Sequence, residues 1–172
     1  SSNGALTLNS SMAGSMAGTA TLDNTSGTIQ AARDASVQAH SISNSGGSIR
    51  AGNDLALASD ALTNGGSLLA GRDLSISLQS DFNNDATVQT GNDLTINAAH
   101  IKNSNGNSAQ NASLLAGGKL STNSTTLVNN ASIIGGELSI KASQSIVNSG
   151  PQALLGASDV NGTLELLAPV IH

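Results

Sequence analysis

Four aspartates at regular spacing are the residues of this chain most able to act together chemically. Asp34, Asp54, Asp73 and Asp93 each follow an Arg or Asn and precede a run of alternating apolar residues. A column of carboxylates could hold a cation such as calcium, which binds several oxygen ligands around one centre. The alternative is an exposed turn in which each carboxylate accepts hydrogen bonds from nearby backbone N–H groups. We favour the turn, because the Gly-Gly-x-Gly-x-Asp pattern of calcium-binding β-rolls does not occur.

Three basic residues occupy the same turn in one repeat or another, namely Arg33, Arg72 and Lys119. In the turn interpretation, their charges relieve the repulsion between carboxylates that stack about 4.8 Å apart. The aspartates are then structural, and we expect no metal site.

The histidines and serines do not form a catalytic or metal-binding pattern. His40 and His100 fall near the same position of the repeat but three repeats apart, roughly 14 Å by the spacing of strands. That separation is too long for a shared metal, and His172 is terminal. No serine stands in the Gly-x-Ser-x-Gly turn that supports acyl transfer.

The composition excludes several kinds of partner. The 172 residues include six Lys and Arg against eleven Asp and Glu, so the net charge is −5. Six dispersed cations cannot form the basic stripe that binds nucleic acid. Cys is absent and no run of 18 apolar residues occurs, which excludes disulfides, thiolate sites and membrane insertion. Aromatic residues are only 1% of the chain, so aliphatic side chains must form a thin core.

An internal repeat of roughly 20 residues organises the chain. Its clearest copies begin at Gly47, Gly66 and Ala86, and weaker copies precede and follow them. Each unit has three short runs in which apolar and polar residues alternate, separated by Gly, Asn, Asp and Ser. Alternation with a period of two predicts strands, and the separating residues predict turns.

Stacked copies of this unit predict an all-β fold, a right-handed parallel β-helix of about eight coils with three short strands per coil. One unit cannot bury its apolar side chains alone, whereas stacking buries them in columns along the axis. The first strands supply the predicted core column Ile29, Ile49, Leu68, Val88, Leu114 and Ile133. The second strands supply the column Leu55, Leu74, Leu94, Leu120 and Leu138.

The third strand of each unit ends in an apolar residue, one variable residue and an asparagine. An inward Asn can hydrogen-bond to the Asn one coil away, as in stacked sheets, and it tolerates a left-handed turn. We interpret these residues as one ladder that is structural and not catalytic. Its members are Asn24, Asn44, Asn64, Asn84, Asn103, Asn129 and Asn148.

Two stretches break the period and predict loops pushed out from the coil, near 11–18 and 104–111. After Asn148 the pattern weakens, because Leu154 and Leu155 fit a first strand but 164–167 does not fall where a second strand is expected. The last residues, 169–172, lack the polar cover that a solenoid end needs. We therefore interpret 1–172 as a single β-helical segment cut from a longer filament.

A polysaccharide-degrading enzyme is one alternative, because β-helices carry such activities. These enzymes need clustered carboxylates or a basic residue beside a groove. The remaining acids are instead dispersed over different repeats: Asp23, Asp60, Asp81, Asp85, Asp159, Glu137 and Glu165. We expect no enzyme, no catalytic residue and no cofactor.

The unit N-[SGN]-G-[GAS]-x-[ILV]-x-A-G-x-D-L-x-[IL]-x-A resembles the repeats of filamentous haemagglutinin and of CdiA-type contact-dependent growth inhibition proteins. These are large exoproteins of bacterial two-partner secretion systems. Residues 47–57, 66–78 and 86–98 carry the resemblance, with degenerate copies from about 27 to 148. It implies a β-helical shaft that projects from a Gram-negative cell. The Asn-Pro-Asn motifs of the family's secretion domain and a toxin signature are both missing, so the resemblance is to the shaft alone.

The resemblance also implies a secreted or cell-surface location and an outer-membrane transporter as partner during export. Two functions fit it. The chain is either a passive shaft that carries an adhesive, receptor-binding or toxin-delivering region, or an adhesin whose own face or loops bind a glycan or protein receptor. The regular units favour the shaft, because nothing distinguishes one face chemically. Phe82 is the only aromatic residue and falls in a core column, so no exposed ring is left to stack on a sugar.

Overall fold

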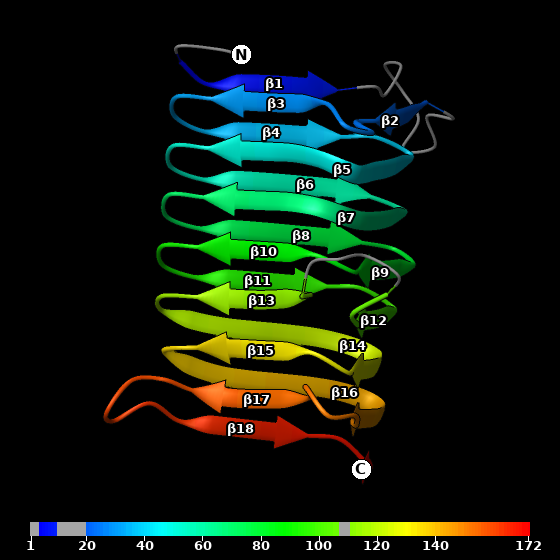
Figure 1. The fold of residues 1–172 in the computed structure, drawn as a ribbon, viewed down its shortest axis with the longest axis vertical. Coiled ribbons are helices and arrows are strands. Elements are labelled where there is room, and N and C mark those ends of the chain that lie inside the picture. The colour runs from blue at the N-terminus through cyan, green and yellow to red at the C-terminus, as the bar shows by residue number, and fades with distance from the viewer. Residues whose placement is uncertain (1–3, 10–19, 107–110) are drawn as a thin grey trace.

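The protein is an all-β rod in the computed structural model, which describes residues 4–9, 20–106 and 111–172 (Figure 1). Among the described residues, 19 strands form one sheet. The strands of the middle coils pair in parallel with those one coil before and one coil after, whereas the strands at the two ends pair on one side only. Within these ranges no helix is long and apolar enough to cross a lipid bilayer.

The strands lie in three columns that run along the rod. The first column contains β3 (Thr28–Ala31), the second halves of β5 (Ser41–Ala51) and β7 (Ala61–Ala70), β10 (Thr87–Thr90), β13 (Ser113–Ala116), β15 (Ser132–Gly135) and β17 (Leu154–Ala157). The second contains β1 (Leu6–Asn9), β4 (Ala35–Gln38), β6 (Leu55–Ser59), β8 (Leu74–Leu78), β11 (Leu94–Asn97), the first halves of β14 (Lys119–Asn129) and β16 (Glu137–Asn148), and β18 (Leu164–Leu167). The third contains β2 (Thr21–Asp23), the first halves of β5 and β7, β9 (Asp81–Asn84), β12 (His100–Asn103), the second halves of β14 and β16, and β19 (Val170–Ile171).

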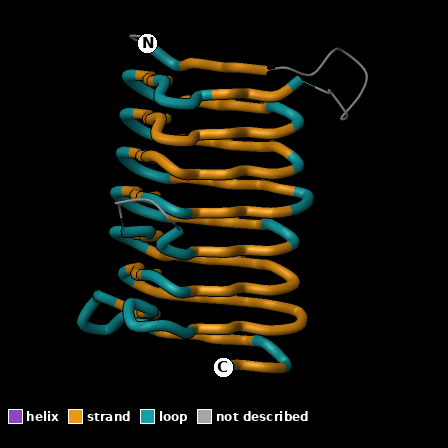
Figure 2. Tube along the Cα trace, turned by 45° about the vertical axis from the view of Figure 1, so that its right-hand side comes forward, coloured by secondary structure: helices purple, strands orange, loops and turns teal. Residues whose placement is uncertain are grey.

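The predicted right-handed parallel β-helix is confirmed. The turned view shows the strands wrapping around one axis with turns between them (Figure 2). The rod makes about seven turns, close to the eight expected from the repeats.

Alternation of side chains within each strand builds the core. In β8, Leu74 and Ile76 are buried whereas Ser75 and Ser77 are exposed. The register stacks like on like, since Leu74 lies against Leu55 on one side and Leu94 on the other. Both predicted core columns are aligned in this way. Every member has a relative exposure of 2% or less except Ile29, in the first strand of its column, which is half-buried.

A glycine comes directly after most strands of the first column, because neighbouring coils approach each other closely at that turn. A Cβ atom on Gly71 would lie 1.9 Å from the carbonyl oxygen of Gly52, and one on Gly91 would lie 2.2 Å from that of Gly71. Both distances are far below van der Waals contact. A side chain at Gly71 or Gly91 would therefore push two stacked coils apart, which explains why Gly recurs at this turn of the unit.

The last coil corrects one expectation. Residues 164–167 form β18 and pair in register with β16, so that Leu164 lies against Leu138 and Leu166 against Ile140. The sequence pattern missed this alignment because six residues, 158–163, separate β17 from β18, whereas three, 91–93, separate β10 from β11. The extra residues enlarge a turn and leave the column intact.

The two predicted loops differ in what the structure describes. The stretch 11–18 lies outside the described residues. Nine residues, 104–112, separate β12 from β13, whereas two, 85 and 86, separate β9 from β10. Of this second stretch, 107–110 lie outside the described residues, and 104–106 and 111–112 lie at the corner between the third and first columns.

Candidate functional site

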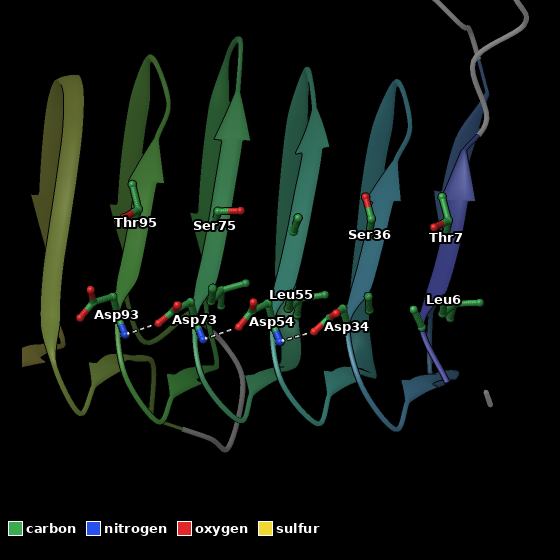
Figure 3. Close-up of a pocket in the computed structure, with 14 residues that line it drawn as sticks. Leu6, Thr7, Asp34, Ser36, Asp54, Leu55, Asp73, Ser75, Asp93 and Thr95 are labelled. Carbon is green, nitrogen blue, oxygen red and sulfur yellow. Dashed lines mark hydrogen bonds between the residues drawn. The ribbon is translucent and has the colours of Figure 1, made fainter. Parts of the chain in front are cut away.

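An open groove of about 600 Å³ follows the second column on the side where the four aspartates lie (Figure 3). Thr7, Ser36, Ser75 and Thr95 line it, from β1, β4, β8 and β11. Each is exposed and alternates with apolar residues that face inward, which are buried in β4, β8 and β11 and partly buried in β1. The groove thus has small hydroxyl side chains along its length and carboxylates along one edge.

The aspartates are linked to one another through the backbone. The N–H of Asp54 donates to Oδ1 of Asp34 at 3.3 Å, that of Asp73 to Asp54 at 3.3 Å, and that of Asp93 to Asp73 at 3.1 Å (Figure 3). Lys119 follows in the same position and donates its N–H to Asp93 at 2.8 Å. Each carboxylate therefore ties its own turn to the turn of the next coil.

Two side chains add to this arrangement. The Arg72 guanidinium holds both oxygens of Asp54, with Nε 2.9 Å from Oδ1. This contact lowers the pKa of Asp54 below its ordinary value and raises the pKa of Arg72. The amide of Asn92 donates to Asp73 at 2.7 Å.

The column of carboxylates is accordingly engaged with donors of the protein itself. Within the ranges that the structure describes, no three His, Cys, Asp or Glu side chains are arranged to hold a metal ion. The chemistry that the geometry supports is the capping of turns between coils.

The histidines and remaining acids make local contacts on separate coils. His40 Nδ1 lies 3.0 Å from a carboxylate oxygen of Asp60, and His100 Nδ1 lies 2.8 Å from the Thr126 hydroxyl. In the last coil, Glu165 accepts a 2.7 Å hydrogen bond from Ser139, with Lys141 at 3.8 Å. The hydrogen bond, and then the lysine charge, lower the pKa of Glu165.

The seven asparagines form a continuous chain of side-chain hydrogen bonds inside the rod. Each Nδ2 donates to Oδ1 of the Asn in the next coil at 2.7 or 2.8 Å, from Asn24 to Asn148. The same amides also bind backbone carbonyls of the following turn, as Asn84 does to Ala86 at 2.8 Å. The six buried members of the chain thus have hydrogen-bond partners for their amides away from water, and Asn148, at its end, is half-buried.

A second hollow, of about 390 Å³, lies at the corner enlarged by the insertion. Asn105 and Asn111 on one side face Pro151 and Gln152 on the other, above the short turn at Ala131. The Asn105 amide donates to the Gln152 side chain across this short turn. The lining is uncharged, and this hollow distinguishes its coils from the regular ones.

Sequence reasoning missed two features of the interior. The first is the close approach at the glycine turns, which depends on the distance between coils. The second is a pair of inward hydroxyls, Thr122 and Ser124, on β14. A signal existed for Thr122, since it takes the place of the isoleucines Ile96 and Ile140 in neighbouring units.

Comparison with known proteins gives one result. A sequence model described as the haemagglutinin repeat matches residues 1–79 and 61–150. No curated protein and no solved structure gives a significant match.

Proposed function

Because the chain belongs to the haemagglutinin repeat family, we propose that it is a structural shaft of a secreted filamentous exoprotein. The repeat family is one of structural adhesin repeats found in secreted surface adhesins of Gram-negative bacteria. The shaft would hold an adhesive, receptor-binding or toxin-delivering region away from the cell. An outer-membrane transporter would export it as a two-partner secretion substrate.

One observation carries the proposal, the unbroken axial stacking of the coils. The Asn chain and the two apolar columns continue from coil to coil. The backbone ladders also continue, and they resume in register after a shift in the β5–β7 ladder and another in the β14–β16 ladder. Each coil adds about 4.8 Å of length. The length of a rod built in this way increases with each coil that the chain adds. Spanning a distance in this way needs no catalytic group or cofactor.

Deletion of one coil in the parent exoprotein tests the shaft function. Removing residues 47–65 joins Gly46 to Gly66, and Gly66 is the structural equivalent of Gly47 because Ser48 pairs with Ser67. We expect a folded rod shorter by about 4.8 Å and a parent protein that still acts on target cells. Loss of activity while the rod stays folded would contradict a passive shaft.

The hollow at Asn105 and Gln152 favours a second function, direct binding of a neutral glycan. Amide side chains donate to and accept from sugar hydroxyls, and Pro151 and Leu154 offer an apolar surface. The volume falls within the range of small-molecule pockets. This site lies at the corner between columns, away from the carboxylate groove.

Glycan-array screening of the 172-residue chain tests this second function. Saturable binding that is lost in Gln152→Ala and retained in Gln144→Ala, an exposed residue outside the hollow, would support an adhesin. Absence of binding to any arrayed glycan would leave the shaft as the only proposal.

A further inference from the structure

Two hydroxyls are buried in the apolar interior without a hydrogen-bond partner among the described residues. They are Oγ1 of Thr122 and Oγ of Ser124. Both belong to the first half of β14 and point inward, with relative exposures of 3% and 8%. Thr122 stacks between Ile96 and Ile140, so aliphatic side chains lie on both sides of its hydroxyl.

Other inward hydroxyls of the rod are satisfied. Ser59 occupies the position equivalent to Ser124 three coils earlier, and its hydroxyl donates to the carbonyl of Ala61 at 2.9 Å. Thr90 lies in a column of alanines and donates to the carbonyl of Arg72. The defect therefore arises from the surroundings of β14 and not from the presence of a hydroxyl.

The ladder that joins this coil to the next shifts register between Ser124 and Thr126. A similar shift occurs between Ser45 and Ser48 in the ladder of β5 and β7, where no buried hydroxyl among the described residues lacks a partner. In β14 the shift therefore coincides with the loss of hydrogen bonding in the core.

We propose that the coil containing β14 is a built-in yielding point, at which the rod opens locally before it unfolds as a whole. A buried polar group without a partner destabilises the closed state, and opening hydrates it. Because a solenoid is stabilised by nearest-neighbour contacts, a weak coil separates two more stable blocks. A shaft under tension would extend there first. The inference concerns the rod itself and does not depend on which partner the shaft carries.

Native-state hydrogen exchange on the 172-residue chain tests the proposal. In the unmodified chain, amides of β14 should be less protected than those of β6 and β8. Thr122→Val with Ser124→Ala removes both hydroxyls at nearly constant volume. We expect this pair to raise the protection of β14 by about 5- to 30-fold, with little change in β6 and β8.

The matched controls are Ser59→Ala and Thr90→Val, which remove inward hydroxyls that are hydrogen-bonded. They should lower protection in their own coils. Unchanged or lower protection of β14 in the Thr122→Val and Ser124→Ala chain would overturn the proposal, since it would mean that the hydroxyls are satisfied. An equal rise along the whole rod would overturn it too, because the rod would then open as one unit.

Discussion

The central coils and the last coil use the same columns but bury them to different extents. In β6, β8 and β11 each inward side chain lies between two equivalents, and Leu74 is 2% exposed. In β18 the aligned Leu164 has an equivalent on one side only and is 49% exposed. Register is thus fixed by one neighbouring coil, whereas burial requires two. The contribution of a side chain to the free energy of unfolding should therefore depend more on whether coils lie on both sides of it than on its residue type.

Truncation of one leucine in each region should show the largest difference. Leu74→Ala should lower the free energy of unfolding by about 2–5 kcal/mol, because it leaves a cavity between Leu55 and Leu94. Leu164→Ala, in the same column, should cost about 1 kcal/mol or less, since half of its side chain is already in water. Urea unfolding followed by circular dichroism measures both. Equal losses would show that position along the rod does not set the energy.

The Asn chain gives a second contrast. Asn64→Leu should lower stability by about 1–3 kcal/mol, because it leaves the Asn44 amide and the Asn84 carbonyl without their partners. Thr63→Ala, the preceding exposed residue, should change stability by less than about 0.5 kcal/mol. Similar effects of the two substitutions in thermal unfolding would contradict an inward role for the Asn side chain.

The glycines give a third contrast, between one at a close approach of two coils and one with space around it. Gly71→Ala should destabilise the rod by about 1–3 kcal/mol, because the new Cβ would meet the carbonyl of Gly52 and push the coils apart. Gly156→Ala in β17 is the control, since its Cβ would lie 3.8 Å from Ile134, at ordinary contact distance. Comparable melting temperatures for the two variants would indicate that the coils separate without cost.

Much of the fold could be predicted because the unit repeats. An alternating run fixes which side chains face inward, and its return every 19 or 20 residues fixes which residues stack, as with Leu68 and Val88. The sequence could not reveal the alignment of 164–167, because a longer turn hides an unchanged column. Close contacts between coils, such as that at Gly71, arise from packing distance and leave no trace in periodicity.

The candidate sites were harder to foresee than the columns. The turn position of the aspartates follows from their place between two alternating runs. Their link to the backbone of the next coil requires the register between coils, which gives Asp73 its donor on Asp93. The hollow at Asn105 depends on two enlarged turns that lie 47 residues apart in sequence. Spacing within one repeat contains no information about such a pair.

Acid titration compares the charged contacts of the central coils with those of the last coil. We expect it to give the smallest change in stability of all these comparisons. Arg72 holds the pKa of Asp54 below its ordinary value of about 3.9, so the folded state binds fewer protons than the unfolded chain in this range. The resulting stabilisation is present above pH 4 and is lost as the pH falls through the lowered pKa of the folded state. The carboxylate is exposed, and solvent screening keeps the gain small.

The variants Asp54→Asn and Glu165→Gln separate the two regions in this titration. Each should melt slightly lower than the unmodified chain at pH 7, with the difference disappearing toward pH 2, because protonation removes the same interaction. Asp54→Asn should have the larger effect, since Arg72 binds both oxygens of Asp54 whereas Lys141 stands 3.8 Å from Glu165. A difference that persists at pH 2 would show that the substitution acts through packing and not through charge.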